Sequence, residues 1–91
     1  MDTLKQALGK AVKSFRSARD LPQDLLGSQA FVSDLERGRK TASLVKLHHI
    51  GMTLGIHPLS VIAAAYRIAD PEISRDELLR RIEKELIEVG L

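Results

Sequence analysis

Cysteine is absent from the 91-residue sequence. Its absence excludes disulfide bonds and thiolate metal sites, and it agrees with a reducing compartment. Long apolar runs are missing too, since the longest, Val61 to Tyr66, is far shorter than a bilayer span. The residues from Met1 to Lys5 lack the apolar core of a signal peptide. We therefore expect a cytoplasmic protein that has no membrane partner.

Patterns of catalytic residues are equally scarce. The sequence has no glycine-rich phosphate loop, nucleophile elbow or Ser/His/Asp order. His48 and His49 would point about 100° apart on a helix, and no carboxylate lies at ligand spacing beside them. These histidines and His57 therefore fit solvent-facing or capping positions, and Asp76 and Glu77 fit a helix N-terminus. We expect no enzyme, no metal and no cofactor.

The net charge of +2 conceals two unlike segments. Residues 1–69 carry 10 Lys and Arg against 5 Asp and Glu, whereas residues 70–91 carry 4 against 7. The first segment can therefore meet a polyanion, although many solvated helix surfaces carry similar charge. The length fits one domain with a modest core, to which association with a second copy would add stability.

Apolar residues recur at three- and four-residue spacing through most of the chain, and β-alternation is missing. The fold class is therefore all-α. The expected helices cover residues 4–18, 22–26, 29–37, 44–54, 58–68 and 75–89. Their expected N-caps are Asp2 or Thr3 for the first helix, Ser28 for the third, Ser43 for the fourth and Ser74 for the sixth.

The second and fifth of these helices have features that bear on packing. The short second helix would begin at Pro22 and turn Leu25 and Leu26 inward. The fifth, which begins at Pro58, has too few polar positions to face water on half its surface. It would therefore be covered by something beyond the first four helices.

The sixth helix carries an apolar stripe. Ser74 and Glu77 fit a capping box at its start. The stripe repeats at 3-4-3 spacing and consists of Leu79, Ile82, Leu86 and Val89. It could fold back onto the fifth helix or pair with a partner's copy of the same helix, and an isologous dimer allows both.

Several short motifs together resemble one known family. They are Phe15-Arg16, the segment from Leu21 to Asp24, the segment from Ser28 to Lys40, Ser43-Leu44 and Leu54-Gly55-Ile56. Over roughly residues 4–66, the chain resembles the helix-turn-helix regulators of the phage repressor and Cro-like class, often called XRE. The resemblance implies a five-helix repressor-like DNA-binding domain over residues 1–69, with residues 70–91 as a sixth helix for dimerisation or core completion.

In such a fold the third helix enters the major groove of double-stranded DNA. The resemblance places Gln29, Ala30, Ser33 and Asp34 as candidates for base contacts. A glutamine amide can pair with adenine, the alanine methyl suits a thymine methyl, and an aspartate can accept a hydrogen bond from cytosine. Phe31, Val32 and Leu35 share another face of the helix and are expected in the core.

The resemblance also implies phosphate contacts and one internal ion pair. The candidates for phosphate contacts are Gln23, Ser28, Arg39, Lys40 and Thr41. A solvated turn is the alternative for the last three. Gln23 would also brace the recognition helix. Arg16 and Glu36 occupy the positions of a partly buried ion pair that orients the helices. The segment between Gln23 and Ser28 is about five residues shorter than the family pattern, which shortens the first helix of the motif.

These features favour a sequence-specific transcriptional regulator of a bacterium or phage. Two copies would read a pseudo-palindromic operator with half-sites about one helical turn apart. Double-stranded DNA and a second copy of the chain are the expected partners, and a regulatory protein is a further candidate. The alternatives are a protein-interaction module, such as an antitoxin-like partner, and a regulator whose DNA binding is switched by a protein or small molecule.

Overall fold

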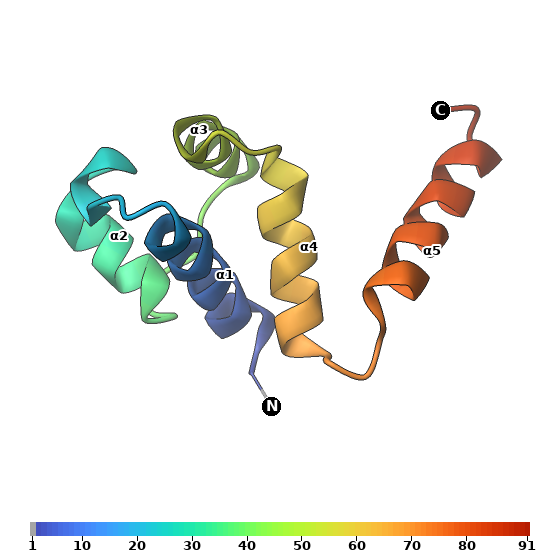
Figure 1. Cartoon of the computed structure of the whole chain (residues 1–91), viewed down its shortest axis with the longest axis horizontal. Helices are drawn as coiled ribbons and strands as arrows, with labels where there is room; N and C mark the ends of the chain where they lie inside the picture. The colour runs from blue at the N-terminus through green and yellow to red at the C-terminus, as the bar shows by residue number, and fades with distance from the viewer. Residues whose placement is uncertain (1) are drawn as a thin grey trace.

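The computed structural model describes residues 2–91, and these residues form helices without any strand. This confirms the all-α fold. The elements are α1 (Leu4–Ala18), the 3-10 turn η1 (Gln23–Leu25), α2 (Gln29–Glu36), α3 (Leu44–Leu54), α4 (Pro58–Ala69) and α5 (Arg75–Glu88). Figure 1 shows α1 to α4 gathered into one body, with α5 standing apart beyond α4.

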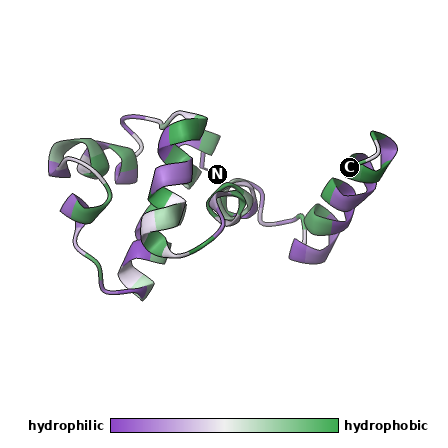
Figure 2. Cartoon of the chain, turned by 90° about the horizontal axis from the view of Figure 1, so that it is seen from above, coloured by the Kyte–Doolittle hydropathy of each residue, from purple (hydrophilic) through white to green (hydrophobic). Residues whose placement is uncertain are grey.

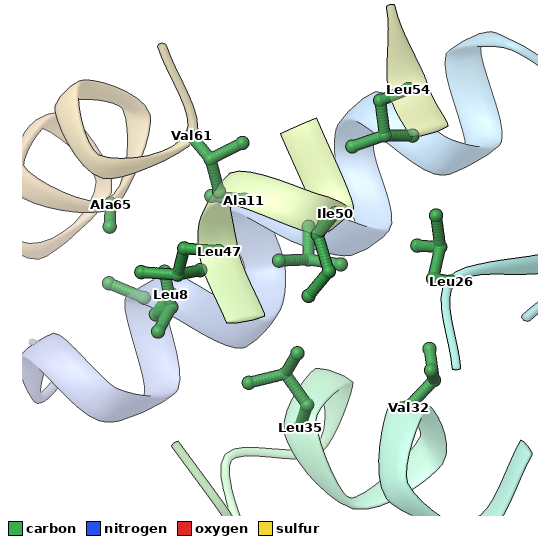
Figure 3. Close-up of a cluster of buried hydrophobic side chains, with 12 residues drawn as sticks. Leu8, Ala11, Leu26, Val32, Leu35, Leu47, Ile50, Leu54, Val61 and Ala65 are labelled. Atoms are coloured by element: carbon green, nitrogen blue, oxygen red, sulfur yellow. The ribbon is translucent and has the colours of Figure 1, made fainter. Parts of the chain in front are cut away.

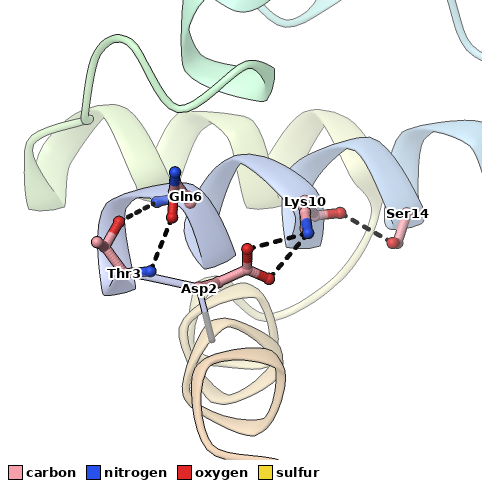
Figure 4. A network of polar contacts seen from close by, with 5 residues as sticks. All are labelled: Asp2, Thr3, Gln6, Lys10 and Ser14. Carbon is pink, nitrogen blue, oxygen red and sulfur yellow. Dashed lines mark hydrogen bonds and ion pairs between the residues drawn. The ribbon is translucent and has the colours of Figure 1, made fainter.

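A capping box fixes the start of α1. The Thr3 hydroxyl accepts a hydrogen bond from the Gln6 amide, and the Gln6 side chain accepts one from the Thr3 amide. Asp2 instead pairs with Lys10 at 2.9 Å, so Thr3 rather than Asp2 is the N-cap (Figure 4).

Polar side chains cap the other helices as well. Ser28, Ser43 and Ser74 each accept a bond from the amide three residues ahead, and His57 Nδ1 accepts one from the Leu59 amide. The predicted caps Ser28, Ser43 and Ser74 are confirmed. Of the capping box predicted at Ser74 and Glu77, the structure of residues 2–91 contains only the hydrogen bond from the Glu77 amide to the Ser74 hydroxyl.

The predicted second helix is only a single 3-10 turn. Pro22 precedes η1 in an extended conformation. Leu26 is buried, with 4% of its surface exposed, but Leu25 is 54% exposed, so the prediction that both leucines face inward is wrong for Leu25. In a 3-10 turn, consecutive side chains point about 120° apart, and both cannot meet the same core.

The core lies where α1 crosses the other helices. Its fully buried members include Val12 of α1. Val32 and Leu35 of α2, Ile50 of α3 and Val61 of α4 are fully buried too (Figure 3). Residues from four helices thus meet at α1, which makes this helix the central support of α2.

Gly9 allows α1 and α2 to approach closely. A Cβ placed on Gly9 would lie 2.1 Å from the Leu35 carbonyl oxygen and 2.9 Å from that of Glu36. The conformation of Gly9 is ordinary helix, so the missing side chain matters here for space alone. The C-terminal turn of α2 therefore rests directly on the backbone of α1.

The last helix makes little contact with the rest of the chain. Arg67 of α4 donates hydrogen bonds to the carbonyls of Pro71 and Ile73, which holds the connecting segment against α4. The predicted stripe of α5 remains 39% to 70% exposed, and Figure 2 shows its apolar face uncovered. The stripe therefore does not fold back onto α4 within one chain.

In the described part of the chain, no single helix is both long and apolar enough to cross a membrane. Only α3 and α4 together reach that length and hydropathy, as a pair bent by 105°.

Candidate nucleic-acid interface

One face of α2 is buried and the opposite face is open. Val32 and Leu35 are fully buried, while Gln29 and Ala30 are exposed and Ser33 is half-buried. Phe31 packs against the edge of the core. The expected core residues of this helix are thus confirmed. The open face of α2 carries Gln29, Ala30 and Ser33, which we call the α2 ridge.

An ion pair fixes the C-terminal end of α2. Arg16 Nε lies 2.6 Å from Glu36 Oε2, and Arg16 Nη2 lies 2.9 Å from Glu36 Oε1. Arg16 also donates to the Leu21 carbonyl at 2.8 Å, and the Gln23 amide donates to Glu36 Oε1 at 3.0 Å. One carboxylate therefore ties α1, η1 and α2 together.

Burial of Glu36 and its hydrogen bonds act on its pKa in opposite directions. Desolvation raises the pKa, but hydrogen bonds from Arg16 and Gln23 and the charges of Arg16 and Lys13 outweigh this effect. The pKa of Glu36 consequently lies below its ordinary value. The bond to Glu36 likewise holds the pKa of Arg16 above its ordinary value, despite desolvation.

These bonds bear on Gln23, for which the family resemblance implied a phosphate contact that also braces the recognition helix. Its amide nitrogen is directed at Glu36, so the side chain braces α2 from inside the protein. An amide nitrogen carries two hydrogens, and the second is available for another acceptor.

Asp34 is tied to the turn that follows α2. Its carboxylate lies 3.5 Å from Lys40 Nζ and 4.0 Å from Arg39 Nη1. Its backbone carbonyl also accepts the amides of Arg39 and Lys40, in a turn that Gly38 permits with φ of 74°. The structure thus brings three predicted DNA-contact residues together, but with one anion among the cations.

A hollow lies between α1 and α2, and the α2 ridge forms part of its wall. This α1–α2 hollow measures about 580 Å³ and is lined by Lys13, Arg16, Gln23, Gln29, Ala30, Ser33, Glu36 and Arg37. It contains all three residues of the ridge. Lys13 and Arg37 were not among the residues predicted from the sequence.

A second hollow lies on the other side of α2. It measures about 300 Å³ and is lined by Ser28, Phe31, Thr41, Ala42, Ser43 and Lys46. Lys46 Nζ lies 5.4 Å from the centre of the Phe31 ring, a cation–π contact. Sequence reasoning missed Lys46, although its position three residues after the N-cap Ser43 places it on the first turn of α3.

The Arg37 signal was present in the sequence, because the residue follows Ser33 by four positions on the open face. Lys13 gave no such signal, since only packing of α1 on α2 brings it to the ridge.

His48 and His49 are exposed. Residues 2–91 contain no group of three or more His, Cys, Asp or Glu side chains placed to hold a metal ion.

Two solved crystal structures are similar to this chain. No protein-family model and no curated protein sequence matches the chain. A crystal structure of the clp gene regulator ClgR from Corynebacterium glutamicum matches with 33% identity and a TM-score of 0.67, over 71% of this chain and 90% of that one. The chain belongs to the family of this clp gene regulator.

A second ClgR crystal structure matches with 28% identity and a TM-score of 0.68, over 97% of this chain and 90% of that one. A match over 97% of the chain necessarily includes α5. The chain therefore shares with ClgR the all-helical fold of a DNA-binding regulator. Both neighbours are gene regulators.

Proposed function

We propose that the chain is a homodimeric, sequence-specific transcriptional regulator of the phage repressor and Cro-like (XRE) class, acting in the cytoplasm of a bacterium or on behalf of a phage. The observation that carries this proposal is the α2 ridge. Its residues Gln29 and Ala30 are exposed and Ser33 is half-buried. The Arg16, Gln23 and Glu36 network holds the helix that carries them, and cations line the hollows on both sides of that helix.

The ridge suits direct contact with base edges. Gln29 lies in the first turn of α2 with its amide free to pair with adenine, and Ala30 beside it can meet a thymine methyl. Ser33 follows one turn later and can donate or accept. Asp34 is the remaining base-contact candidate, through hydrogen bonding to cytosine.

Phosphate contacts would come from both ends of α2. Arg39, Lys40 and Thr41 are exposed in the turn beyond its C-terminus. At its N-terminus, Ser28 and Gln23 each retain a donor hydrogen beside the bonds described above. Such contacts position the protein on the duplex and make its affinity fall with salt.

Residues 1–69 would read the DNA and residues 70–91 would hold the dimer. The exposed stripe of α5, Leu79, Ile82, Leu86 and Val89, would pack on a second copy and leave water on association. A two-fold axis would then set two α2 helices toward half-sites about one helical turn apart.

Selection of bound sequences from a random DNA pool tests the proposal. We expect an enriched pseudo-palindrome, and a fluorescence-anisotropy titration should show that Gln29→Ala loses preference for it while keeping non-specific binding. The proposal fails if the chain binds no duplex in a salt-dependent manner.

A protein-interaction module is the second candidate. It is favoured by the exposed apolar surface of α4 and α5, which includes Leu59 and Tyr66 as well as the stripe. Analytical ultracentrifugation separates the two. A chain that remains monomeric at micromolar concentration and binds no DNA would support the module.

A further inference from the structure

We propose that the α1–α2 hollow binds a backbone phosphate of one DNA strand through Lys13 and Arg37, while Arg39 and Lys40 meet the opposite strand. This inference rests on the proposed function. It adds a phosphate site that involves α1, and it assigns each strand of the major groove its own set of cations.

The charge of the hollow favours an anion. Three cations line it, Lys13, Arg16 and Arg37, against the single carboxylate of Glu36. Both oxygens of that carboxylate accept hydrogen bonds from inside the protein, from Arg16 and Gln23. Glu36 is therefore neutralised locally, and the hollow presents the charge of the other two cations.

Lys13 and Arg37 are available for a ligand. Both are exposed, and neither forms an ion pair within residues 2–91. Arg16, by contrast, has its guanidinium committed to Glu36 and to the Leu21 carbonyl. A lysine ammonium acts as a mobile point charge and an arginine fork can bind two phosphate oxygens, so the pair suits a phosphodiester.

The geometry of α2 places the two cation sets on opposite flanks. Successive residues of an α-helix are about 100° apart. Gln29, Ser33 and Glu36 therefore share the flank that faces α1, where they line the hollow with Lys13. Asp34 lies about 100° round from Ser33, and it is Asp34 that holds Arg39 and Lys40.

A helix in the major groove has one phosphate backbone on each side. The groove is about 12 Å wide and a helix with its side chains is about 10–12 Å across. With the α2 ridge directed at the bases, the Lys13 side of the hollow would face one backbone and the Asp34 flank would face the other. The short η1 contributes only Gln23 to the wall of the hollow, which leaves this side accessible to a duplex.

The test compares two double variants in the full chain. In Lys13→Ala/Arg37→Ala, the plot of log Kd against log salt concentration should become shallower by about one per protomer, because one phosphate contact is lost, and affinity at about 0.1 M salt should fall at least tenfold. The matched control, Arg80→Ala/Lys84→Ala, removes the same charge from the exposed side of α5 and should leave the slope unchanged. Arg37→Lys keeps the charge and should retain most of the slope.

Neutral methylphosphonate links placed in one strand at a time identify the strand. Neutral links in one strand should lower the DNA affinity of the wild-type protein but not that of Lys13→Ala/Arg37→Ala. Neutral links in the other strand should lower the DNA affinity of the wild type but not that of Arg39→Ala/Lys40→Ala. The inference is overturned if the wild type binds duplex and the first variant keeps the full slope, or if both variants lose sensitivity to the same strand. Failure of the wild type to bind any duplex would instead overturn the proposed function.

Discussion

At the residue scale, Glu36 decides how α2 is held. Its side chain is only 4% exposed and that of Arg16 15%, so water screens their interaction weakly. A buried pair of this kind costs much to break from one side, because the remaining charge is left without a partner. The network therefore orients the α2 ridge. We expect its loss to lower the free energy of unfolding more than it lowers the affinity for DNA.

Glu36→Gln tests this role through pH. The folded-state pKa of Glu36 is lowered, so its stabilisation is complete above its ordinary value of 4.5 and is lost as pH falls through the lower, folded value. At pH 7 we expect the variant to be less stable by about 2 kcal/mol, and the difference should shrink below about pH 4. Urea unfolding between pH 3 and 7 measures it, and a constant difference over that range would contradict the assignment.

Asp34→Asn separates two roles for Asp34. If the carboxylate mainly holds Arg39 and Lys40 and repels phosphate, its removal should raise affinity for non-specific duplex about fivefold, which is about 1 kcal/mol. If Asp34 instead accepts from a cytosine, the variant should lose affinity for the selected operator alone. Anisotropy titrations with both duplexes distinguish these outcomes, with Asp24→Asn, an exposed carboxylate on η1, as control.

At the element scale, the position of α2 depends on its contact with α1. Leu35 and Val32 supply the buried area, but Gly9 sets the distance between the two helix backbones. Helix propensity and packing disagree at this residue, because alanine is the better helix former by about 1 kcal/mol. The separation of 2.1 Å from the Leu35 carbonyl to an added Cβ decides the outcome, since a backbone carbonyl cannot move aside as a flexible side chain can.

Gly9→Ala should therefore destabilise the protein by about 3 kcal/mol, despite its gain in helix propensity. Ser17→Ala, at an exposed position of the same helix, should change stability by no more than about 0.5 kcal/mol. Thermal unfolding followed by circular dichroism compares them. A Gly9→Ala protein as stable as the wild type would mean that α1 and α2 are not in close backbone contact.

At the scale of the whole molecule, a single chain leaves apolar surface uncovered. The stripe of α5 is largely exposed, and on α4 Leu59 is 59% and Tyr66 50% exposed. Figure 1 shows α5 standing apart from the other helices. The sequence predicts that α4 must be covered by something beyond the first four helices. Within one chain, the start of α5 up to Leu79 lines a hollow with α4, and the rest of this surface is open to a second copy or to another protein.

Ile82→Glu tests the dimer that this surface implies. A charge in the middle of the stripe should convert a dimer into a monomer in sedimentation velocity, because an unpaired buried carboxylate costs several kcal/mol. Affinity for the full palindrome should fall at least a hundredfold while binding to a single half-site persists. Ile87→Glu places the same charge on an exposed residue off the stripe and should remain dimeric. Monomeric wild-type protein would contradict the dimer.

Much of this protein follows from local sequence. The helix boundaries, the serine caps, and the choice of Val32 and Leu35 as core could be predicted because they depend on residues three or four positions apart. The family resemblance predicted the ion pair between Arg16 and Glu36, and the structure brings the two side chains together. The local rules went wrong at η1, where too few residues were available for an α-turn.

Only the tertiary structure decided which residues surround the α2 ridge. Lys13 lies sixteen positions before Gln29, yet the packing permitted by Gly9 places both in one hollow. It also turned the Gln23 amide inward, paired Asp34 with the two cations of the turn, and left α5 without cover in its own chain. The physical reason is that periodicity determines which face of a helix is apolar, whereas the neighbours of the polar face depend on how closely, and at what angle, the helices pack.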